Sequence, residues 1–404
     1  MKIGIIREGK VPADKRVPFS PELCIEVMEK FPQIQIIVQP STVRAFSDES
    51  YSSLGIVLQE DLSSCDVLMG VKEVPLDMLI PNKKYFFFSH TFKEQPYNRK
   101  LLKAILDKKI QLIDYETLTD KNGQRIIGFG RFAGIVGAYK AFRGWGEFLG
   151  SYSLKPTFQC KDRIELEKEL TKVKLPANFK MVMTGGGRVG SGAREIVDLL
   201  GMKKVEVASY LNNNHDGPVF CQLDTHHYTK TKDGSAWEKA RFYAHPQDFE
   251  SDFYRFAKQS DLYIACHYWD GDAPMILTNE ELARPDLRIK FISDVSCDML
   301  EPIASTLRPS TIADPFYGYD PKTGKEVPFK TLGSISVQAV DNLPCELPVD
   351  ASVDFGKALL AKVIPFLVGP DPDRVIERAS ETDLNGKLTA DYSYLDDYVN
   401  GVTS

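Results

Sequence analysis

The chain has 404 residues, of which 43% are hydrophobic and 26% are charged, and its formal net charge at pH 7 is −6. This size and balance predict a globular protein of two domains with a sizeable core. Because the lysines and arginines are dispersed, we expect no basic face for nucleic acid. No apolar run approaches the ~18 residues of a membrane span, and the first six residues do not resemble a signal peptide. We therefore expect a cytoplasmic protein.

Cysteine and histidine usage argues against disulfides and metal. The seven cysteines are scattered, without a Cys-x-x-Cys pair, which is typical of reduced thiols. We find nothing beside the pair His226-His227 that completes a set of metal ligands, and we expect no metal.

The N-terminal part predicts a strand at residues 2–6, a charged loop and then a helix. Ser20 is suited to be the N-cap of this helix and Pro21 its first residue. Arg16 therefore lies between a strand end and a helix start, where open α/β sheets commonly bind ligands. The alternative is a solvated surface arginine.

Further strands are expected at residues 34–38, 66–71, 85–88 and 110–113. The last three are followed by Lys72, by His90 and Lys93, and by Glu116, which would lie along one edge of a parallel sheet. A lysine, a histidine and a carboxylate form an acid–base set for proton transfer. The alternatives are a strand-end hydrogen bond for His90, pairing of Lys72 with Glu73 or Glu116, and a helix-surface position for Lys93.

Small residues at positions 130, 134, 137 and 138 predict a closely packed helix that begins the connection between the domains. Residues 151–178, rich in lysine and glutamate, predict a linker or an added helix.

A glycine loop follows a short strand at residues 181–183. Gly185, Gly187 and Gly190 fit the pattern G-x-G-x-x-G and precede an amphipathic helix and a strand at 205–208. In this context the pattern predicts dinucleotide binding, with the pyrophosphate at the helix N-terminus. An ordinary glycine turn is the alternative.

The choice between NAD and NADP stays open from sequence. The predicted second strand ends in Ala208-Ser209-Tyr210, without an acidic residue to bind a ribose 2′-hydroxyl. Arg188 could meet a 2′-phosphate or point to solvent.

The rest of the predicted nucleotide domain consists of an irregular insertion, at residues 212–246, and two further strands. The strand from residue 261 runs into Cys266-His267, and the strand at 289–298 carries Asp294 and Asp298 at its mouth, although aspartate also favours turns. The predicted cofactor-binding residues are Gly185, Gly187, Arg188, Val189, Gly190, Ser209, Cys266, His267 and Asp294.

Six motifs, in this order, resemble those of the lysine-forming saccharopine dehydrogenases: Gly70 to Pro75, Phe88 to Gln95, Asp114 to Glu116, Phe129 to Gly134, Thr184 to Ala193 and Val340 to Pro344. The likeness is greatest to the lysine–2-oxoglutarate reductase half of the bifunctional aminoadipate semialdehyde synthases. More distantly, the layout is similar to alanine dehydrogenase and to the transhydrogenase nucleotide domain.

The resemblance implies an α/β protein of two Rossmann-like domains with parallel sheets and an interdomain cleft. Residues 1–138 and 335–404 would form the substrate domain, and residues 139–334 the dinucleotide-binding domain. By the same resemblance, Lys72 and His90 are the acid–base pair and Glu116 joins them as a catalytic residue. Arg16, Lys93, Arg131 and Asp341 would bind substrate, and Asp294 lies where alanine dehydrogenases carry a catalytic aspartate.

The implied reaction is the reversible, NAD- or NADP-dependent condensation of L-lysine with 2-oxoglutarate to give saccharopine. Two alternatives remain: reductive amination of a small 2-oxo acid, as in alanine dehydrogenase, and a catalytically inactive nucleotide-binding regulator. We expect small-molecule substrates, no nucleic acid or membrane partner, and a possible homo-oligomer.

Overall fold

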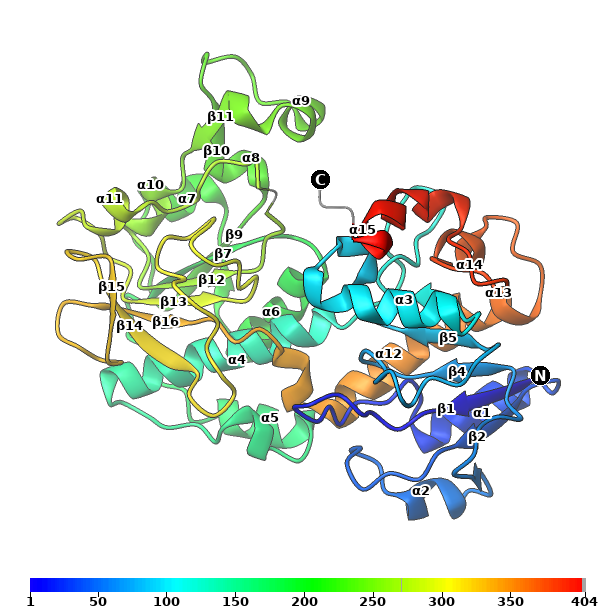
Figure 1. Cartoon of the computed structure of the whole chain (residues 1–404). Coiled ribbons are helices and arrows are strands. Elements are labelled where there is room, and N and C mark those ends of the chain that lie inside the picture. Colours follow the sequence, from blue (N-terminus) through cyan, green and yellow to red (C-terminus); the bar gives the residue numbers. More distant parts are fainter. Residues whose placement is uncertain (270, 402–404) are drawn as a thin grey trace. The chain divides into compact units, whose positions relative to one another are not determined.

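The computed structural model describes residues 1–269 and 271–401, and the chain divides into two compact units (Figure 1). Unit 1 comprises Met1–Phe129 and Pro348–Ser404, and unit 2 comprises Gly130–Leu347. The predicted boundaries lie after residue 138 and before residue 335, so they differ from the limits of these two units. Helix α4 (Gly130–Leu149) and strand β16 (Ile335–Gln338) belong wholly to unit 2, because α4 packs along α6 (Arg188–Leu199) and β16 pairs with β13 (Phe291–Asp294).

Unit 1 is built on a six-stranded, wholly parallel sheet with the strand order β3-β2-β1-β4-β5-β6. Its strands are β1 (Lys2–Ile5), β2 (Gln35–Val38), β3 (Val57–Leu58), β4 (Val67–Met69), β5 (Lys84–Phe87) and β6 (Gln111–Asp114). Successive residues of β4 belong to different cores: Val67 and Met69 to one, and Leu68 to the other. Both faces of the sheet are therefore buried, which explains why the strands read as continuous apolar runs.

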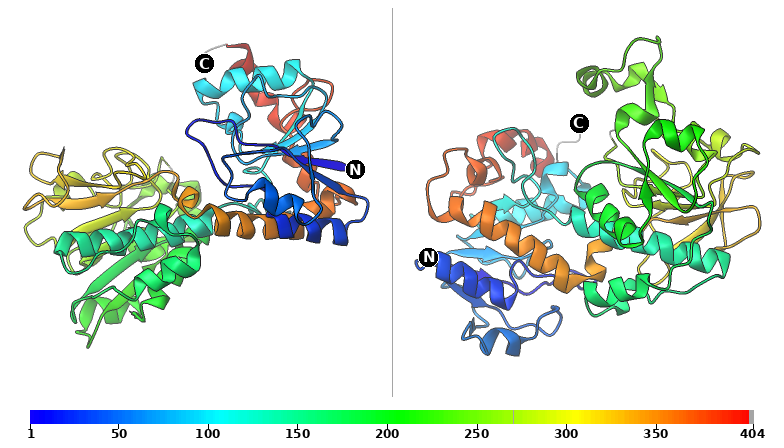
Figure 2. Two further views of the ribbon diagram at one scale, coloured as in Figure 1. Left: turned by 90° about the horizontal axis from the view of Figure 1, so that it is seen from below. Right: turned by 180° about the vertical axis from the view of Figure 1, so that it is seen from behind.

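Helices cover both faces of this sheet. They are α1 (Pro21–Lys30), α2 (Asp48–Ser52), α3 (Arg99–Asp107), α12 (Pro348–Lys362), α13 (Ile364–Val368), α14 (Val375–Arg378) and α15 (Asp396–Asn400). Helices α1 and α12 lie side by side (Figure 2) and contribute Leu23 and Phe355 to one core, whereas α3 contributes Ile105 to the other. As predicted, Ser20 caps α1: its side chain accepts a hydrogen bond from the Leu23 N–H group.

Unit 2 contains an eight-stranded sheet with the order β15-β14-β16-β13-β12-β7-β9-β8. The strands besides β13 and β16 are β7 (Lys180–Thr184), β8 (Lys203–Lys204), β9 (Val219–Leu223), β12 (Leu262–Ala265), β14 (Phe316–Asp320) and β15 (Lys325–Val327). Strand β14 runs antiparallel to both β15 and β16. The predicted α/β fold of two Rossmann-like domains is confirmed. The sheet of unit 2 is parallel except at the edge formed by β14 and β15, where a turn joins these two strands in a hairpin.

The remaining helices of unit 2 are α5 (Arg163–Leu170), α7 (Val207–Asn212), α8 (Thr225–Tyr228), α9 (Lys239–Ala244), α10 (Tyr254–Ala257) and α11 (Asn279–Leu282). The strand predicted at residues 205–208 is wrong, since α7 begins at Val207 and occupies its second half. Val207, Tyr210 and Leu211 recur at helical spacing and contact one core. The strand beside β7 is instead β9, further along the chain.

A small two-stranded sheet of β10 (Thr229–Thr231) and β11 (Phe249–Ser251) extends from unit 2 together with α9 (Figure 1). Among the described helices of the chain, none is both long and apolar enough to cross a membrane.

Candidate functional site

The carboxyl ends of the neighbouring strands β4, β5 and β6 bring an acid–base cluster together in unit 1. His90 Nδ1 lies 3.0 Å from Glu73 Oε1, and His90 Nε2 lies 3.6 Å from Glu116 Oε2. The Lys93 ammonium donates to Glu116 Oε1 over 2.9 Å. The structure thus gathers His90, Lys93 and Glu116, as predicted from their positions after successive strands, and adds Glu73.

Glu73 sets the orientation of the histidine. Burial acts to raise the pKa of Glu73, but hydrogen bonds with His90 and Lys10 outweigh it and lower this pKa to about 2. An ionised carboxylate can only accept, so Nδ1 of His90 carries the proton that it shares with Glu73. Neutral His90 therefore presents a lone pair on Nε2, on the side of Glu116.

Glu116 is also held in its charged form. Burial acts to raise its pKa, but the Arg125 guanidinium, the Lys93 ammonium and His90 together lower it. Arg125 Nη1 lies 3.4 Å from Glu116 Oε1. His90 therefore lies between two carboxylates, an arrangement that can accept a proton on Nε2 and stabilise the resulting cation.

Lys72 is half-buried, and its position is fixed through the backbone. Glu8 accepts hydrogen bonds from the N–H groups of Val71 and Lys72, over 2.6 and 2.9 Å. Burial raises the pKa of Glu8 to about 7, although these two hydrogen bonds oppose the rise. Within the described residues the Lys72 ammonium has no ion pair, so its predicted pairing with Glu73 or Glu116 is not found; Glu116 is occupied by Lys93 and Arg125.

A buried carboxylate below the cluster positions its backbone. His90 has a left-handed conformation, with φ of 56°. Asp114 Oδ2 accepts from the N–H groups of Ser89 and His90, over 2.8 and 3.2 Å, and Oδ1 accepts from that of Glu116 over 2.6 Å. One side chain thus holds both ends of the His90–Glu116 pair, which helps to keep the histidine in an uncommon conformation.

A second buried acid reaches this network from the C-terminal segment. Glu381 accepts from the hydroxyls of Thr91, over 2.6 Å, and Ser89, over 3.3 Å. Burial and the nearby Asp114 raise the pKa of Glu381 to about 8, and burial raises that of Asp114 too. Two carboxylates that lie close together in a buried site are most stable when they hold one proton between them.

The other predicted substrate residues are distributed over both units. Arg16 is buried, so the alternative of a solvated arginine is wrong; it makes a bidentate pair with Asp14, at 3.0 and 2.6 Å, and lies 4.2 Å from the centre of the Phe129 ring. Arg131 and the exposed Asp341 belong to unit 2 rather than to the predicted substrate domain. Arg131 donates to both carboxylate oxygens of Glu195, over 2.6 and 2.9 Å, because α4 and α6 are neighbours.

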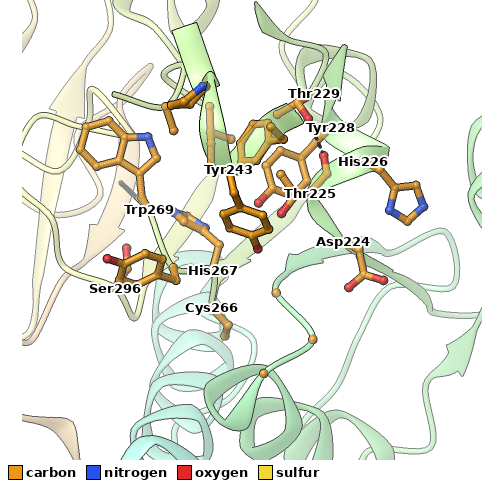
Figure 3. A pocket seen from close by; sticks show the side chains of 18 of the residues that line it. Asp224, Thr225, His226, Tyr228, Thr229, Tyr243, Cys266, His267, Trp269 and Ser296 are labelled. Carbon is orange, nitrogen blue, oxygen red and sulfur yellow. Dashed lines mark hydrogen bonds between the residues drawn. The ribbon is translucent and has the colours of Figure 1, made fainter. Parts of the chain in front are cut away.

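Unit 2 contains a pocket of about 880 Å³ at the carboxyl ends of β7, β9, β12 and β13 (Figure 3). The predicted cofactor residues that line it are Gly185, Gly187, Arg188, Val189, Cys266 and His267.

The three glycines have the geometry that a dinucleotide loop requires. Gly185 has φ of +93°, and a Cβ atom there would lie 2.3 Å from the Cys266 carbonyl oxygen. A Cβ at Gly190 would lie 2.1 Å from the Gly185 oxygen, whereas a Cβ at Gly187 would meet nothing within 4 Å. The first and third glycines thus permit close packing, and the second leaves open space before α6, where a pyrophosphate fits.

Asp224 lies at the end of the strand beside the glycine-loop strand, where an acidic residue would bind a ribose 2′-hydroxyl and where none was recognised in the sequence. It directly follows β9, the strand beside β7, and it lines the pocket. A Cβ at Gly186 would come within 2.9 Å of its carboxylate. Ser209, predicted to bind the cofactor, instead lies on α7 and is not among the residues lining the pocket.

Asp294 also differs from its predicted role. It is fully buried and accepts hydrogen bonds from Ser296 and Cys297 on one oxygen and from Thr306 on the other. Burial raises its pKa. Asp294 therefore stabilises the turn after β13, and Ser296 and Asp298 line the pocket in its place.

His267 offers the pocket an unused polar atom. Its side chain is 7% exposed, with Nδ1 2.8 Å from the Thr184 hydroxyl oxygen, and burial lowers its pKa to about 3, so the ring is neutral. Nε2 has no hydrogen-bond partner among the described residues. Because a buried polar atom without a partner is costly, Nε2 suits a bound ligand.

Comparisons with known proteins show which proteins the chain resembles. Residues 4–136 match the model of the alanine dehydrogenase/PNT N-terminal domain. The chain is 28% identical to alpha-aminoadipic semialdehyde synthase of Arabidopsis thaliana over 97% of its own length, but it spans only 41% of that protein. It is 26% identical to the NAD(+)-dependent, L-lysine-forming saccharopine dehydrogenase of Emericella nidulans, over 90% of the chain and 91% of the relative. The chain is thus similar over most of its length to both of these proteins.

A solved L-alanine dehydrogenase shares the fold of this chain. It covers all of both chains with a TM-score of 0.68 at 16% identity. At this identity the likeness shows the fold alone.

Asp224 also completes a group of possible metal ligands with His226 and His227, whose ligand atoms lie within 4.8 Å of one another. The prediction that nothing completes such a set is therefore wrong. However, Nδ1 of His227 accepts from the Asp224 N–H group over 3.0 Å, so neutral His227 carries its proton on Nε2 and has no free lone pair for a metal.

Sequence reasoning missed three acidic side chains of these two sites. Glu73 lies inside a recognised motif but was considered only as a partner of Lys72. Asp224 follows the apolar run Val219–Leu223, a strand signal inside what was treated as an irregular insertion. Glu381 lies far along the chain from its partners, and no local pattern marks it.

Proposed function

We propose that the chain catalyses the reversible, NAD-dependent condensation of L-lysine with 2-oxoglutarate to saccharopine. The observation that carries this proposal is the pair of carboxylates on either side of His90, in a chain that aligns over most of its length with lysine-forming saccharopine dehydrogenases.

The reaction needs proton transfers at the ε-nitrogen of the substrate lysine and at the hydroxyl oxygen of the carbinolamine. The ε-amine of lysine attacks the keto carbon of 2-oxoglutarate, and the resulting carbinolamine loses water to give an imine. His90 Nε2, which has a lone pair when neutral, takes the proton from the attacking amine and returns one to the departing hydroxyl. Lys72 is the second acid–base group. A bound nicotinamide supplies hydride to the imine carbon.

The carboxylates of the substrates need cations. Lys93 and Arg125 lie at Glu116 and are 40% exposed, so they remain accessible to a carboxylate ligand. Arg16 and its partner Asp14 are a buried ion pair, so a substrate carboxylate would have to share the guanidinium with Asp14. The substrate roles of Arg16, Arg131 and Asp341 stay predictions.

The position of Asp224 favours NAD over NADP. An acid at the end of the strand next to the glycine-loop strand accepts hydrogen bonds from the ribose 2′-hydroxyl and repels a 2′-phosphate. Asp224 has this place after β9, and it approaches the loop at Gly186. The cytoplasmic location and a homo-oligomeric state stay predictions.

A matrix of initial rates tests the proposal. L-Lysine with 2-oxoglutarate, and pyruvate with ammonium, are each combined with NADH or NADPH. We expect turnover with lysine, 2-oxoglutarate and NADH, and a preference for NADH that Asp224→Ser reduces about tenfold or more. Turnover with pyruvate and ammonium alone would favour the alanine dehydrogenase alternative. Nucleotide binding without any turnover would favour the regulator.

A further inference from the structure

Residues 225–251, here called the arm, begin directly after Asp224 and contain α8, β10, α9 and β11. An aromatic cluster fills the arm. The Trp237 ring lies 5.9 Å from Phe242 and 6.3 Å from Phe249, and Phe242 lies 5.7 Å from Tyr243.

Polar contacts hold this cluster in place. The indole N–H of Trp237 donates to the Thr229 hydroxyl over 2.9 Å, and Arg241 bridges Asp233 and Asp248 at 3.0 and 3.1 Å. The arm is therefore a packed element with its own small core, and it can hold a side chain in a defined place against a ligand.

Several aromatic residues of the arm line the pocket, among them Trp237, Phe242 and Tyr243. Phe242 is buried, at 9% exposure, whereas Tyr243 is 65% exposed. Figure 3 shows its ring between His267 and Thr225, the residue next to Asp224. A large exposed aromatic side chain at the wall of a pocket is typical of a surface that a ligand covers.

His267 lines the same pocket, and its Nε2 is buried and has no hydrogen-bond partner among the described residues. We call the space between Tyr243 and His267 the slot. It has an aromatic ring on one side and a neutral, buried histidine on the other. Asp224 marks the adenosine ribose position beside it, while Ser296 and Asp298 lie at the end of β13, on a different strand.

We infer that Tyr243 and His267 form the adenine-binding slot of the dinucleotide: the Tyr243 ring covers the face of the base, and His267 Nε2 makes a hydrogen bond with it. This inference rests on the proposed use of NAD. A purine has a flat π-face and several ring and exocyclic nitrogens, which are the groups that such a slot recognises. The arm thereby acquires a role, as the part of unit 2 that closes over the adenosine half of the cofactor.

Binding of half-cofactors to the full-length protein tests the slot. Calorimetric titrations with AMP and with nicotinamide mononucleotide compare the unmodified protein with Tyr243→Ala and Tyr243→Phe. We expect Tyr243→Ala to weaken AMP binding about tenfold and to leave binding of the mononucleotide unchanged, whereas Tyr243→Phe, which keeps the ring, binds AMP normally. Tyr97→Ala is the matched control, because Tyr97 is 66% exposed but lies in unit 1.

Unchanged AMP affinity in Tyr243→Ala, or an equal loss for both half-cofactors, would overturn the slot. His267→Phe provides a second variant, for which we expect weaker AMP binding with an unchanged mononucleotide affinity; normal AMP binding by this variant would overturn the role of Nε2. No lysine or 2-oxoglutarate is present, so the slot can stand even when the proposed reaction fails. If the unmodified protein binds neither half-cofactor, both proposals are wrong.

Discussion

His90 illustrates how neighbouring charges select the chemistry of one side chain. Glu73 fixes the proton on Nδ1, and Glu116 lies beside Nε2, where it can stabilise the charged ring after proton uptake. Two further cations, Lys93 and Arg125, keep Glu116 ionised. As a result, His90 can exchange protons only through Nε2.

The acid pair below His90 leads to a prediction about pH. The pKa of Glu381 is raised to about 8 in the folded protein, mainly by burial, from an ordinary value of 4.5. A raised pKa means that the folded state binds the proton more tightly than the unfolded state does. The stabilising effect is thus complete below the unfolded pKa and is lost as the pH rises through about 8.

We therefore expect the free energy of unfolding to fall between pH 6 and pH 8, by up to about 2 kcal/mol, and Glu381→Gln to remove most of this fall. Glutamine resembles the protonated acid and cannot ionise. Urea unfolding at both pH values measures the effect. Glu377→Gln is the control, since that side chain is 64% exposed on the same segment. An equal fall in the Glu381→Gln variant would show that another group is responsible.

At the residue scale, the sequence predicted which side chains lie together in the acid–base cluster, but not which of them form ion pairs. Residues that follow successive parallel strands reach one edge, so His90, Lys93 and Glu116 could be placed together. The choice of Lys93 and Arg125 as partners of Glu116, instead of Lys72, depends on the loop conformations after the strands. One of these contains a left-handed histidine, which sequence patterns do not specify.

At the scale of elements, helices α4 and α6 show how glycine permits close packing. A Cβ at Gly134 would lie 1.9 Å from the Val189 oxygen, and a Cβ at Gly192 would lie 1.9 Å from the Arg131 oxygen. Each helix therefore rests against the backbone of the other. This contact fixes α6, whose N-terminus follows the glycine loop.

Two glycines of the same region should respond differently to substitution. Gly192→Ala places a methyl group against backbone, so α4 and α6 must separate, and we expect a loss of about 1–3 kcal/mol and a lower Tm. Gly187 has open space and a negative φ of −78°, so Gly187→Ala should keep the Tm. Its methyl group should nevertheless weaken NADH binding, because it occupies the approach of the pyrophosphate. Thermal unfolding and NADH titration separate the two effects, and a normal Tm for Gly192→Ala would contradict the packing argument.

Unit 2 also shows where sequence patterns fail to distinguish a strand from a helix. Residues 205–208 have the composition of a strand, but Tyr210 and Leu211 extend an apolar helical stripe, and the helix packs better on the core. Because of that error, the strand Val219–Leu223 was assigned to the irregular insertion. Asp224, which follows this strand, was therefore not recognised as a cofactor-binding candidate. A single misassigned element thus left the choice of cofactor open.

At the scale of the whole molecule, the acid–base cluster and the pocket lie in separate compact units. The alternation of strands and helices was enough to predict the α/β class, since parallel strands are usually connected through a helix. The antiparallel hairpin of β14 and β15 was not predicted, because edge strands carry little periodic signal. The acid–base cluster uses residues of unit 1 alone, and every residue lining the pocket belongs to unit 2.

This division predicts that cofactor binding survives the loss of the acid–base group. We expect His90→Gln to lower kcat by a factor of about 10² to 10⁴, the usual contribution of a general acid–base group. NADH should still raise the Tm of the variant by as much as it raises that of the unmodified protein, because binding to the folded state stabilises it in proportion to the logarithm of ligand concentration over Kd. Thermal unfolding with and without NADH, beside initial rates, measures both. Gly187→Ala is the reciprocal control, for which NADH should raise the Tm less. A His90→Gln protein with normal turnover would remove His90 from the mechanism, and one that no longer responds to NADH would mean that the two sites do not act as separate parts.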